Sequence, residues 1–506
     1  MVAGIDKQTV ALYILVYMMK QIAQWAIDTA SKRGATYCDA RIVNDRQRAL
    51  ATKNGKIGHA ADSESLGIGV RVIVNNAWGF ASTDDLSRES VQRTAARAVE
   101  IARASSRVQQ HPIRLAPEKP ITADWTNPCK IDPFSTSIEQ NLALLMACDK
   151  ELRSVAGVTL AEAQITLRRY EQWFHSNEGC DIHQTRFITG AGYDAYAFAG
   201  TEIQKRSYPN SFGGQYQNKG YELIDELHLI ENARRIGEEA VALHKADQCP
   251  EGKFTIVLGS SQLGLQIHES VGHPIELDRV LGMEANFAGT SFLTLDKLRN
   301  LRYGSDLVNV VADATEQHGP GLGTFAYDDE GVPAQCTPII TNGLFTGYLS
   351  SRETAHAIGS NRSGGTMRAE GWNRIPIIRM TNISILPGET PLTFEQLIAD
   401  TDKGIFMQTN RSWSIDDKRY NFQFGTEIGW EIKGGKLGRM LKNPSYSGIT
   451  TEFWNSMDAI CSRDQWTLWG TPNCGKGQPM QTMGTGHGAS PARFRNVKVG
   501  SAYKGT

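Results

Sequence analysis

The sequence has few cysteines for its length, and none of them stand in a C-x-x-C pair. Its 506 residues contain eight, scattered at positions 38, 129, 148, 180, 249, 336, 461 and 474. So sparse a set excludes a scaffold held together by disulfides. It favours reduced thiols in a cytoplasmic protein, most of them small core residues.

Neither sign of charge is in excess, and no apolar run is long. There are 53 basic and 54 acidic residues, for a formal net charge of −1. This balance excludes a strong long-range attraction to nucleic acid or to an anionic membrane. The most apolar run, residues 10–19, is about half as long as a membrane-spanning helix. We therefore expect a soluble chain without nucleic-acid or membrane partners.

The start of the chain allows two interpretations. No small-residue cleavage site follows the apolar run, and residues 20–28 have the pattern of an amphipathic helix. Either residues 10–28 form one long helix, or translation begins at Met18 or Met19 and residues 1–17 are an extension. We favour the extension.

The remaining chain is expected to form two domains of an α+β fold. Residues 18–248 contain strand patterns, the hairpin signal Asn54-Gly55, and helix caps at Ser87 and at Ser137 with Gln140, which predict a small antiparallel sheet with flanking helices. Residues 249–506 contain many short strand patterns between glycine turns, which predict a larger, β-rich, barrel-like domain. The expected elements include short strands at 38–43, 48–52 and 66–74 and one long helix at 221–244.

Candidate catalytic residues are densest in residues 265–278, which read LQIHESVGHPIELD. His268 and His273 offer imidazole nitrogens, the commonest zinc ligands, and Glu269 offers the carboxylate that serves as general base in metalloproteases. In isolation such a motif favours two histidines that cap or pack in a helix without metal. The metal hypothesis therefore depends on the rest of the chain.

The two histidines are five residues apart, whereas the familiar spacing on a helix is four. Five residues turn an ideal helix by about 500°, which leaves the two rings roughly 140° apart. Both can reach one ion only if the helix bulges or stops between them. Gly272 suits the left-handed residue that ends a helix, and Pro274 biases His273 away from helical angles, so we predict a stop. Ser260 or Ser261 is the predicted N-cap.

A catalytic zinc needs three protein ligands and one open position, so one ligand must come from elsewhere. Cys474 is the strongest candidate because nearby glycines let the backbone approach an ion, and Lys476 would favour its thiolate. His487 is the second candidate, and the spacing leaves the choice open. Without metal, Cys474 would be a small buried residue in a turn. Glu276 and Asp278 either hold a ligand histidine or serve as surface or cap residues.

Motifs spread along the chain point to a known family. They are residues 67–72 (GIGVRV), 77–80 (AWGF), 268–273 (HESVGH), 328–333 (DDEGVP), 379–382 (RMTN) and 474–476 (CGK). Together they resemble the TldD/PmbA family of zinc peptidases, and its TldD branch in particular. The resemblance covers nearly all of residues 18–501.

The resemblance implies roles for four residues. In that family two histidines and a late cysteine hold the metal, and the glutamate is the catalytic base. The implied zinc ligands here are His268, His273 and Cys474, with one ion per active subunit, and Glu269 is the implied base. PmbA-type members lack the histidine–glutamate motif and act as partners, so its presence implies a catalytic chain. The family also implies a dimer around an enclosed cavity, formed by two such chains or with a PmbA-type partner.

The predicted function is a zinc metallopeptidase that hydrolyses unfolded or short peptides, modified ones included. A thiolate donates more charge to zinc than a third imidazole would, which favours slow processing over broad digestion. One alternative is a zinc amidohydrolase acting on small non-peptide amides. The other is a non-catalytic, metal-stapled partner that binds peptides, in which His487 would be the fourth ligand of a closed site.

Some residues depart from the family pattern and bear on substrate choice. They are residues 477–480 (GQPM), His487 with Arg493, and the tryptophans Trp413, Trp430, Trp454, Trp466 and Trp469. We expect most of the tryptophans to pack in the core. A subset could instead form an aromatic groove for peptide side chains.

Overall fold

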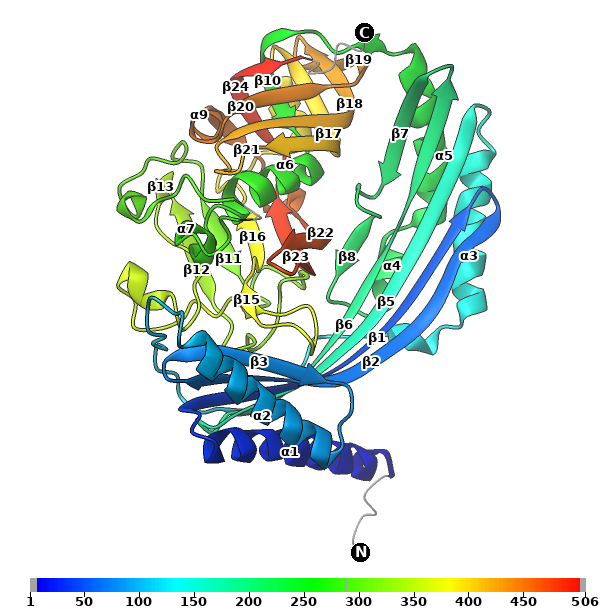
Figure 1. Cartoon of the computed structure of the whole chain (residues 1–506). Coiled ribbons are helices and arrows are strands. Elements are labelled where there is room, and N and C mark those ends of the chain that lie inside the picture. Colours follow the sequence, from blue (N-terminus) through cyan, green and yellow to red (C-terminus); the bar gives the residue numbers. More distant parts are fainter. Residues whose placement is uncertain (1–6, 287–288, 501–506) are drawn as a thin grey trace, which may run out of the picture.

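The N-terminal part is built on one eight-stranded, mostly antiparallel sheet. Its strands are β1 (Tyr37–Lys53), β2 (Lys56–Val74), β3 (Ala77–Thr83), β4 (Thr122–Thr126), β5 (Val158–Ser176), β6 (Asp181–Ala199), β7 (Glu202–Tyr208) and β8 (Gln215–Gln217). Their order is β3-β2-β1-β5-β6-β4, with β7 and β8 also paired to β6. The computed structural model describes residues 7–286 and 289–500, and its longest strands sweep past one side of the C-terminal part (Figure 1).

The strands of this sheet are longer than the sequence predicts. β1 covers both of the short strands expected at 38–43 and 48–52, and it pairs with β2 and β5 over most of its length. Because both neighbours supply ladder hydrogen bonds, the polar stretch between the two predicted strands stays extended. The predicted hairpin is confirmed, with Asn54 and Gly55 at φ values of 48° and 74°.

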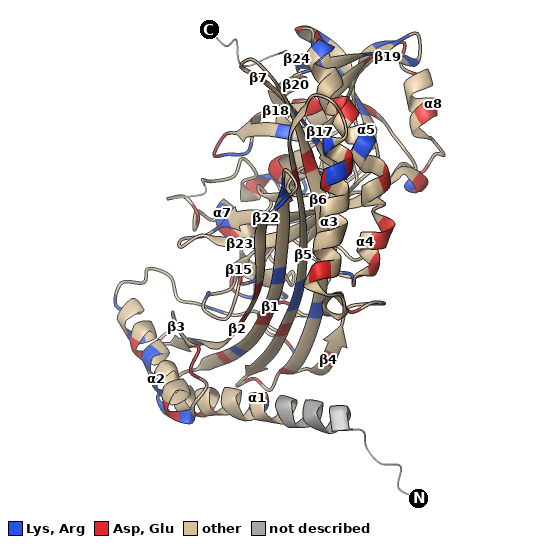
Figure 2. Cartoon of the chain, turned by 90° about the vertical axis from the view of Figure 1, so that its right-hand side faces the viewer, with Lys and Arg blue, Asp and Glu red and all other residues tan. Residues whose placement is uncertain are grey.

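Helices cover the sheet in two groups. α1 (Lys7–Lys32) and α2 (Arg88–Ser105) pack over one end, and α3 (Ile138–Arg153), α4 (Glu222–Glu226) and α5 (Leu229–Ala242) pack over the other. Basic and acidic residues are interspersed on α3 and α5, whereas α4 carries acidic residues only (Figure 2). The caps at Ser87 and Ser137 are confirmed. The single helix expected at 221–244 is wrong, because His228 adopts a left-handed φ of 46° between α4 and α5.

The first helix begins before the predicted start of translation. α1 begins at Lys7 and continues unbroken through Met18 and Met19. This agrees with the interpretation of residues 10–28 as one helix. Residues 1–6 of the predicted extension lie outside the described residues. Within the described part of the chain, no helix is long and apolar enough to cross a membrane.

The barrel-like C-terminal part that the sequence predicts is confirmed, and it contains a closed five-stranded barrel. The barrel strands are β10 (Gly252–Leu258), β17 (Lys403–Ile415), β18 (Asn421–Lys433), β20 (Ser445–Ile449) and β24 (Ala492–Val499). The ring closes because β17 pairs with both β10 and β18. β9 (Asp247–Gln248), β19 (Lys436–Lys442) and β21 (Met457–Ile460) extend it.

A second C-terminal sheet lies next to the barrel (Figure 1). Its order is β13 (Leu344–Phe345), β12 (Cys336–Thr341), β11 (Val310–Asp313), β16 (Asn382–Ile385), β23 (Gln481–Ala489) and β22 (Thr467–Lys476), and β14 (Met367–Arg368) pairs with β15 (Ile377–Ile378) nearby. Helix α6 (Ser260–Ile267) contacts barrel strand β17 as well as β16, β22 and β23 of this sheet. The remaining short α-helices are α7 (Leu277–Val280), α8 (Phe394–Ala399) and α9 (Thr450–Asn455). The main core is built from residues of the barrel, this sheet and α6.

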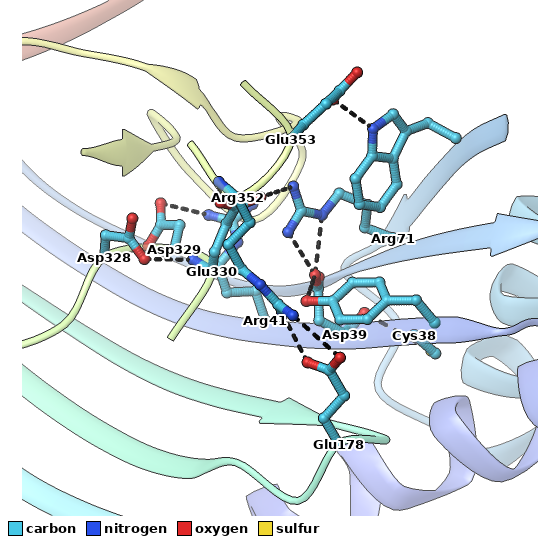
Figure 3. A network of polar contacts seen from close by, with 12 residues as sticks. Cys38, Asp39, Arg41, Arg71, Glu178, Asp328, Asp329, Glu330, Arg352 and Glu353 are labelled. Carbon is cyan, nitrogen blue, oxygen red and sulfur yellow. Dashed lines mark hydrogen bonds and ion pairs between the residues drawn. The ribbon is translucent and has the colours of Figure 1, made fainter. Parts of the chain in front are cut away.

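A buried network of ion pairs joins the two parts (Figure 3). Arg71 on β2 pairs with Asp39 on β1 at 2.7 Å and with Glu330 in the C-terminal part at 3.2 Å. Arg41 on β1 pairs with Asp329 at 3.3 Å. All five side chains are buried, and an unpaired charge is costly in such surroundings. The pairs therefore fix the acidic motif of the C-terminal part against the N-terminal sheet.

Replacement of Arg71 by methionine should destabilise the fold strongly. The variant leaves Asp39 and Glu330 buried without their shared cation, so we expect a loss of about 3–5 kcal/mol in the free energy of unfolding. Chemical denaturation measures this loss. The matched control is Arg97→Met, which removes an exposed pair with Glu100 and should cost much less. Equal losses from the two variants would contradict the assignment.

Candidate metal centre

The two motif histidines lie on a π turn that continues α6. α6 ends at Ile267, and residues His268–Gly272 form the π-helix. The amide of His273 donates to the carbonyl of His268 at 3.1 Å, a bond between residues five apart. Such a turn inserts one extra residue, so positions five apart come to lie on the same side. The bulge that the spacing allowed is therefore what the chain forms.

Two details of the predicted helix ends are wrong. Gly272 is not among the glycines with positive φ, so it does not end the helix in the left-handed conformation. Gly272 instead lies close to another chain segment, because a Cβ there would lie 2.2 Å from the sulfur of Met380. At the other end the N-cap is Gly259, and neither Ser260 nor Ser261 caps the helix.

Three potential metal ligands converge at this turn. The rings of His268 and His273 are 4.9 Å apart and nearly perpendicular. Cys474 on β22 brings its Sγ to 3.8 Å from Nε2 of His273. One ligand atom from each residue lies within 4.8 Å of the other two, and all three residues are buried.

The outer nitrogens of both rings are occupied, which turns Nε2 toward the cluster. His487 donates from Nδ1 to the carbonyl of Ile383 at 3.1 Å, so its Nε2 accepts from Nδ1 of His268 at 2.7 Å. Nδ1 of His273 donates to Glu276 at 3.1 Å. Each ring therefore keeps a free Nε2 lone pair, and such outer partners fix the orientation of metal-binding histidines. His487, the second candidate for the third ligand, supports His268 instead.

The charge states of the cluster also suit a metal ion. Burial lowers the pKa of both His268 and His273, which keeps the rings neutral. Burial alone would raise the pKa of the Cys474 thiol, but the nearby charge of Arg379 counters burial, and the pKa falls below its usual value. Two neutral imidazoles and a thiolate-prone sulfur form a donor set that fits a divalent ion.

Arg379, and not the predicted Lys476, is the cation that lowers this pKa. Lys476 points away, with its ammonium 2.7 Å from Asp278 and 3.4 Å from Glu276. Asp278 therefore neutralises a buried lysine and does not hydrogen-bond to either motif histidine. Glu276 does contact His273, which is one of the two roles predicted for it.

The carboxylate of Glu269 is held by an arginine that the sequence analysis missed. Arg419 donates to Oε2 of Glu269 from the turn between β17 and β18. No motif surrounds Arg419, and it lies 150 residues from Glu269 in the chain. Only the closure of the barrel brings the two together, so no local pattern could have indicated the pair.

Three of the five tryptophans support this region or the core. Trp454 is fully buried and donates to Ser270 in the π turn at 3.0 Å. Trp469 donates to Ser260 at the start of α6 at 3.1 Å. Trp430 stacks on Phe406 with a ring separation of 5.3 Å. Trp466 is half-buried and bonded to a backbone carbonyl, and Trp413 is 45% exposed.

A second cluster with metal-ligand chemistry lies elsewhere, at Asp313, His318 and Cys336. Both carboxylate oxygens of Asp313 are already occupied, one by Thr315 and the other by His318 at 2.7 Å. This cluster is less buried than that of His268, His273 and Cys474.

Comparison with known proteins identifies the family. The family model of the PmbA/TldA metallopeptidase C-terminal domain matches residues 251–501, and the model of PmbA/TldA metallopeptidase domain 1 matches residues 38–102. A metalloprotease of Methanocaldococcus jannaschii is 31% identical over 89% of this chain and 95% of its own. The chain belongs to the TldD/PmbA metallopeptidase family.

One further relative is similar in sequence, and one solved structure is similar in fold. A zinc metalloprotease TldD homolog of Saccharolobus solfataricus is 23% identical over 94% of this chain and 98% of its own. The crystal structure of TldE from Thermococcus kodakarensis has the same fold, with a TM-score of 0.71 at 14% identity, covering 96% of this chain and 100% of that one. The resemblance drawn from the motifs is therefore confirmed, and the chain is a metalloprotease.

Removal of His487 should weaken metal binding without removing a ligand. His487→Phe leaves Nδ1 of His268 without its partner, so we expect the affinity for a divalent ion to fall about 10- to 100-fold. Competition with a chelator, followed by metal analysis, measures this. The control His318→Gln alters the second cluster and should leave the affinity unchanged. An unchanged affinity in His487→Phe would refute the supporting role.

Proposed function

We propose that this metalloprotease is a zinc peptidase whose ion is held by His268, His273 and Cys474, with Glu269 as the general base. One observation carries the proposal: a base-bearing π turn and a distant cysteine bring three ligand atoms within 4.8 Å of one another. Zinc is the ion that favours such a mixture of imidazole and thiolate ligands. It is also the metal named for the relative from Saccharolobus solfataricus.

The residues around the ion divide the chemistry between them. Zinc, when bound, supplies a Lewis acid that polarises the scissile carbonyl and lowers the pKa of water. Glu269 takes the proton of the attacking water and passes it to the leaving amine. Arg419 fixes the Glu269 carboxylate in position, while His487 and Glu276 keep the two imidazoles oriented. The thiolate of Cys474 donates charge toward the ion, which favours slow processing.

The proposed substrates are unfolded or short peptides, modified ones included. His268, Glu269, His273 and Cys474 are each at most 5% exposed, so the backbone of a folded protein cannot reach them. A folded protein should therefore resist cleavage while its denatured form is cut. A zinc amidohydrolase of small amides is the alternative, and a comparison of peptide and small-amide substrates distinguishes the two.

His487 argues against the non-catalytic alternative. In a closed structural site it would be the fourth ligand, but its Nε2 faces Nδ1 of His268 and not the ligand cluster. This arrangement supports a site with three protein ligands and one open position.

We also propose a domain boundary near residue 249, an extension at residues 1–17, and a cytoplasmic location, which the eight free cysteines favour.

The chain is proposed to work as a dimer around an enclosed cavity, either with a second copy or with a PmbA-type partner. The fold that this chain shares with TldE supports a pair of related chains. Size-exclusion chromatography with light scattering, on the chain alone and mixed with such a partner, should show twice the monomer mass in one case. A monomer under both conditions would contradict the dimer.

Replacement of Glu269 by glutamine tests the catalytic role. The amide is nearly isosteric but cannot accept the proton, so we expect turnover of a denatured protein to fall about 10²- to 10⁴-fold with metal content unchanged. Metal analysis and peptide-library cleavage measure the two quantities. The control Glu389→Gln, at an exposed position, should keep full activity. Full activity in Glu269→Gln would exclude Glu269 as the base.

A further inference from the structure

A cavity of about 230 Å³ lies between the N-terminal sheet and the C-terminal part, and residues of both parts line it. One wall is a single face of the sheet, because alternate residues of a strand point the same way. Arg168, Tyr170 and Gln172 on β5 and Gln184 and Arg186 on β6 line this wall. A single water needs roughly 10–15 Å³ of such space, so the cavity has room for a polar group of a ligand.

The opposite wall includes the strand pair that carries Cys474. Pro472 on β22 and Thr482 and Met483 on β23 line the cavity. Met483 lies directly across from Cys474 in the register of the two strands. A ligand in this cavity is therefore bound against the same hairpin that supplies the third potential metal ligand.

Two of the three arginines that line the cavity form hydrogen bonds within the chain. Arg168 forms two parallel bonds to Asp45, at 2.6 and 2.7 Å. Arg368 donates to the backbone carbonyls of Met380, Gly484 and Leu322 at 2.8–3.2 Å. Both guanidinium groups thus have hydrogen-bond acceptors within the fold.

Arg186 is different. Its guanidinium lies over the ring of Tyr170, 4.6 Å from the centroid. Among residues 7–286 and 289–500, no side chain or carbonyl accepts a hydrogen bond from it, and no carboxylate lies within ion-pair distance. Burial lowers the pKa of Arg186, which reflects the cost of keeping this cation away from water. Within the described part of the chain, the cavity thus presents a guanidinium whose N–H donors have no protein acceptor.

The acids that line the cavity form no ion pair with Arg186 among the described residues, although the charge of Asp329 partly offsets the lowering of its pKa by burial. Asp328 accepts three backbone amides, and burial raises its pKa well above the usual value. Asp329 accepts from Gln172 and pairs with Arg41. Glu370 also lines the cavity, and its charge acts on Arg168. A free guanidinium in a partly dry site is the group that best matches a carboxylate, which it can bind with two parallel bonds.

We propose that Arg186 binds a carboxylate of the peptide substrate in this cavity. The carboxylate belongs either to the C-terminus of the peptide or to an aspartate or glutamate side chain. This inference rests on the proposed peptidase function, and it names the class of peptide that the site prefers: one that bears a negative charge near the bond to be cleaved.

The test uses binding as well as cleavage, so that the two proposals can fail separately. Four fluorescent peptides share one sequence and differ in two features, a free or amidated C-terminus and an internal Asp or Asn. Anisotropy with the metal-loaded Glu269→Gln chain measures affinity, and the otherwise unaltered chain gives kcat/KM. Arg186→Gln, in both backgrounds, should weaken binding of the preferred charged peptide about 10- to 100-fold and leave its neutral analogue unaffected.

The controls separate recognition from folding. Arg169→Gln replaces the arginine that follows Arg168 on β5, and its side chain points to the opposite face of the sheet. This variant should change neither the affinity for the peptides nor the preference for charged over neutral ones. Arg186→Lys keeps the charge and should retain part of the preference. Thermal unfolding and metal content of all variants should match those of the parent chain.

Each outcome decides one question. Loss of the free-acid preference assigns the C-terminus to Arg186, and loss of the Asp preference assigns a side chain. If the parent chain binds charged and neutral peptides equally, or if Arg186→Gln and Arg169→Gln behave alike, the inference is wrong. If charged peptides bind through Arg186 but none is cleaved, the inference stands and the proposed peptidase function fails.

Discussion

The candidate metal centre depends on one backbone hydrogen bond, from the amide of His273 to the carbonyl of His268. A regular helix would separate the two rings by roughly 140°. The π turn removes this separation, and its surroundings hold it in place. Met380 packs where a side chain at residue 272 would have to go, and Trp454 donates to Ser270 within the turn. The turn is therefore built into the core and is not a local choice of the helix.

Buried polar groups are costly, and this chain places them where they fix geometry. Around the turn, His487 and Glu276 each occupy one imidazole nitrogen. Farther away, the network around Arg71 fixes the N-terminal sheet against the C-terminal part. Because the sheet is fixed, one of its faces can form the wall of a cavity beside the hairpin of Cys474. Arg186 is the member of this polar set whose partner is proposed to arrive with the substrate.

The sequence predicts the parts of this arrangement that are local. The α+β class, the barrel-like C-terminal part, the hairpin at Asn54 and the caps at Ser87 and Ser137 follow from patterns within a few residues of each other. The spacing of the histidines correctly required a bulge or a stop, but it could not choose between them. The structure has the bulge, and the sulfur of Met380, more than 100 residues away, lies where a Cβ at residue 272 would have to go.

Long-range contacts set the limit of the sequence analysis. Arg419 reaches Glu269 only after the barrel closes, and His487 reaches His268 only after β23 joins β16. Lys476 looked like the partner of Cys474 because it is near in sequence, yet it turns toward Asp278 and leaves that role to Arg379. The predicted strand lengths were too short for a related reason, because pairing with β2 and β5 keeps the polar middle of β1 extended.

X-ray absorption at the zinc edge tests the central claim most directly. For the zinc-loaded chain the account predicts one sulfur neighbour at about 2.3 Å and nitrogen or oxygen neighbours at about 2.0–2.1 Å, with the sulfur lost in Cys474→Ser. A spectrum without sulfur, or one in which sulfur persists after that substitution, would show that the ion is bound elsewhere.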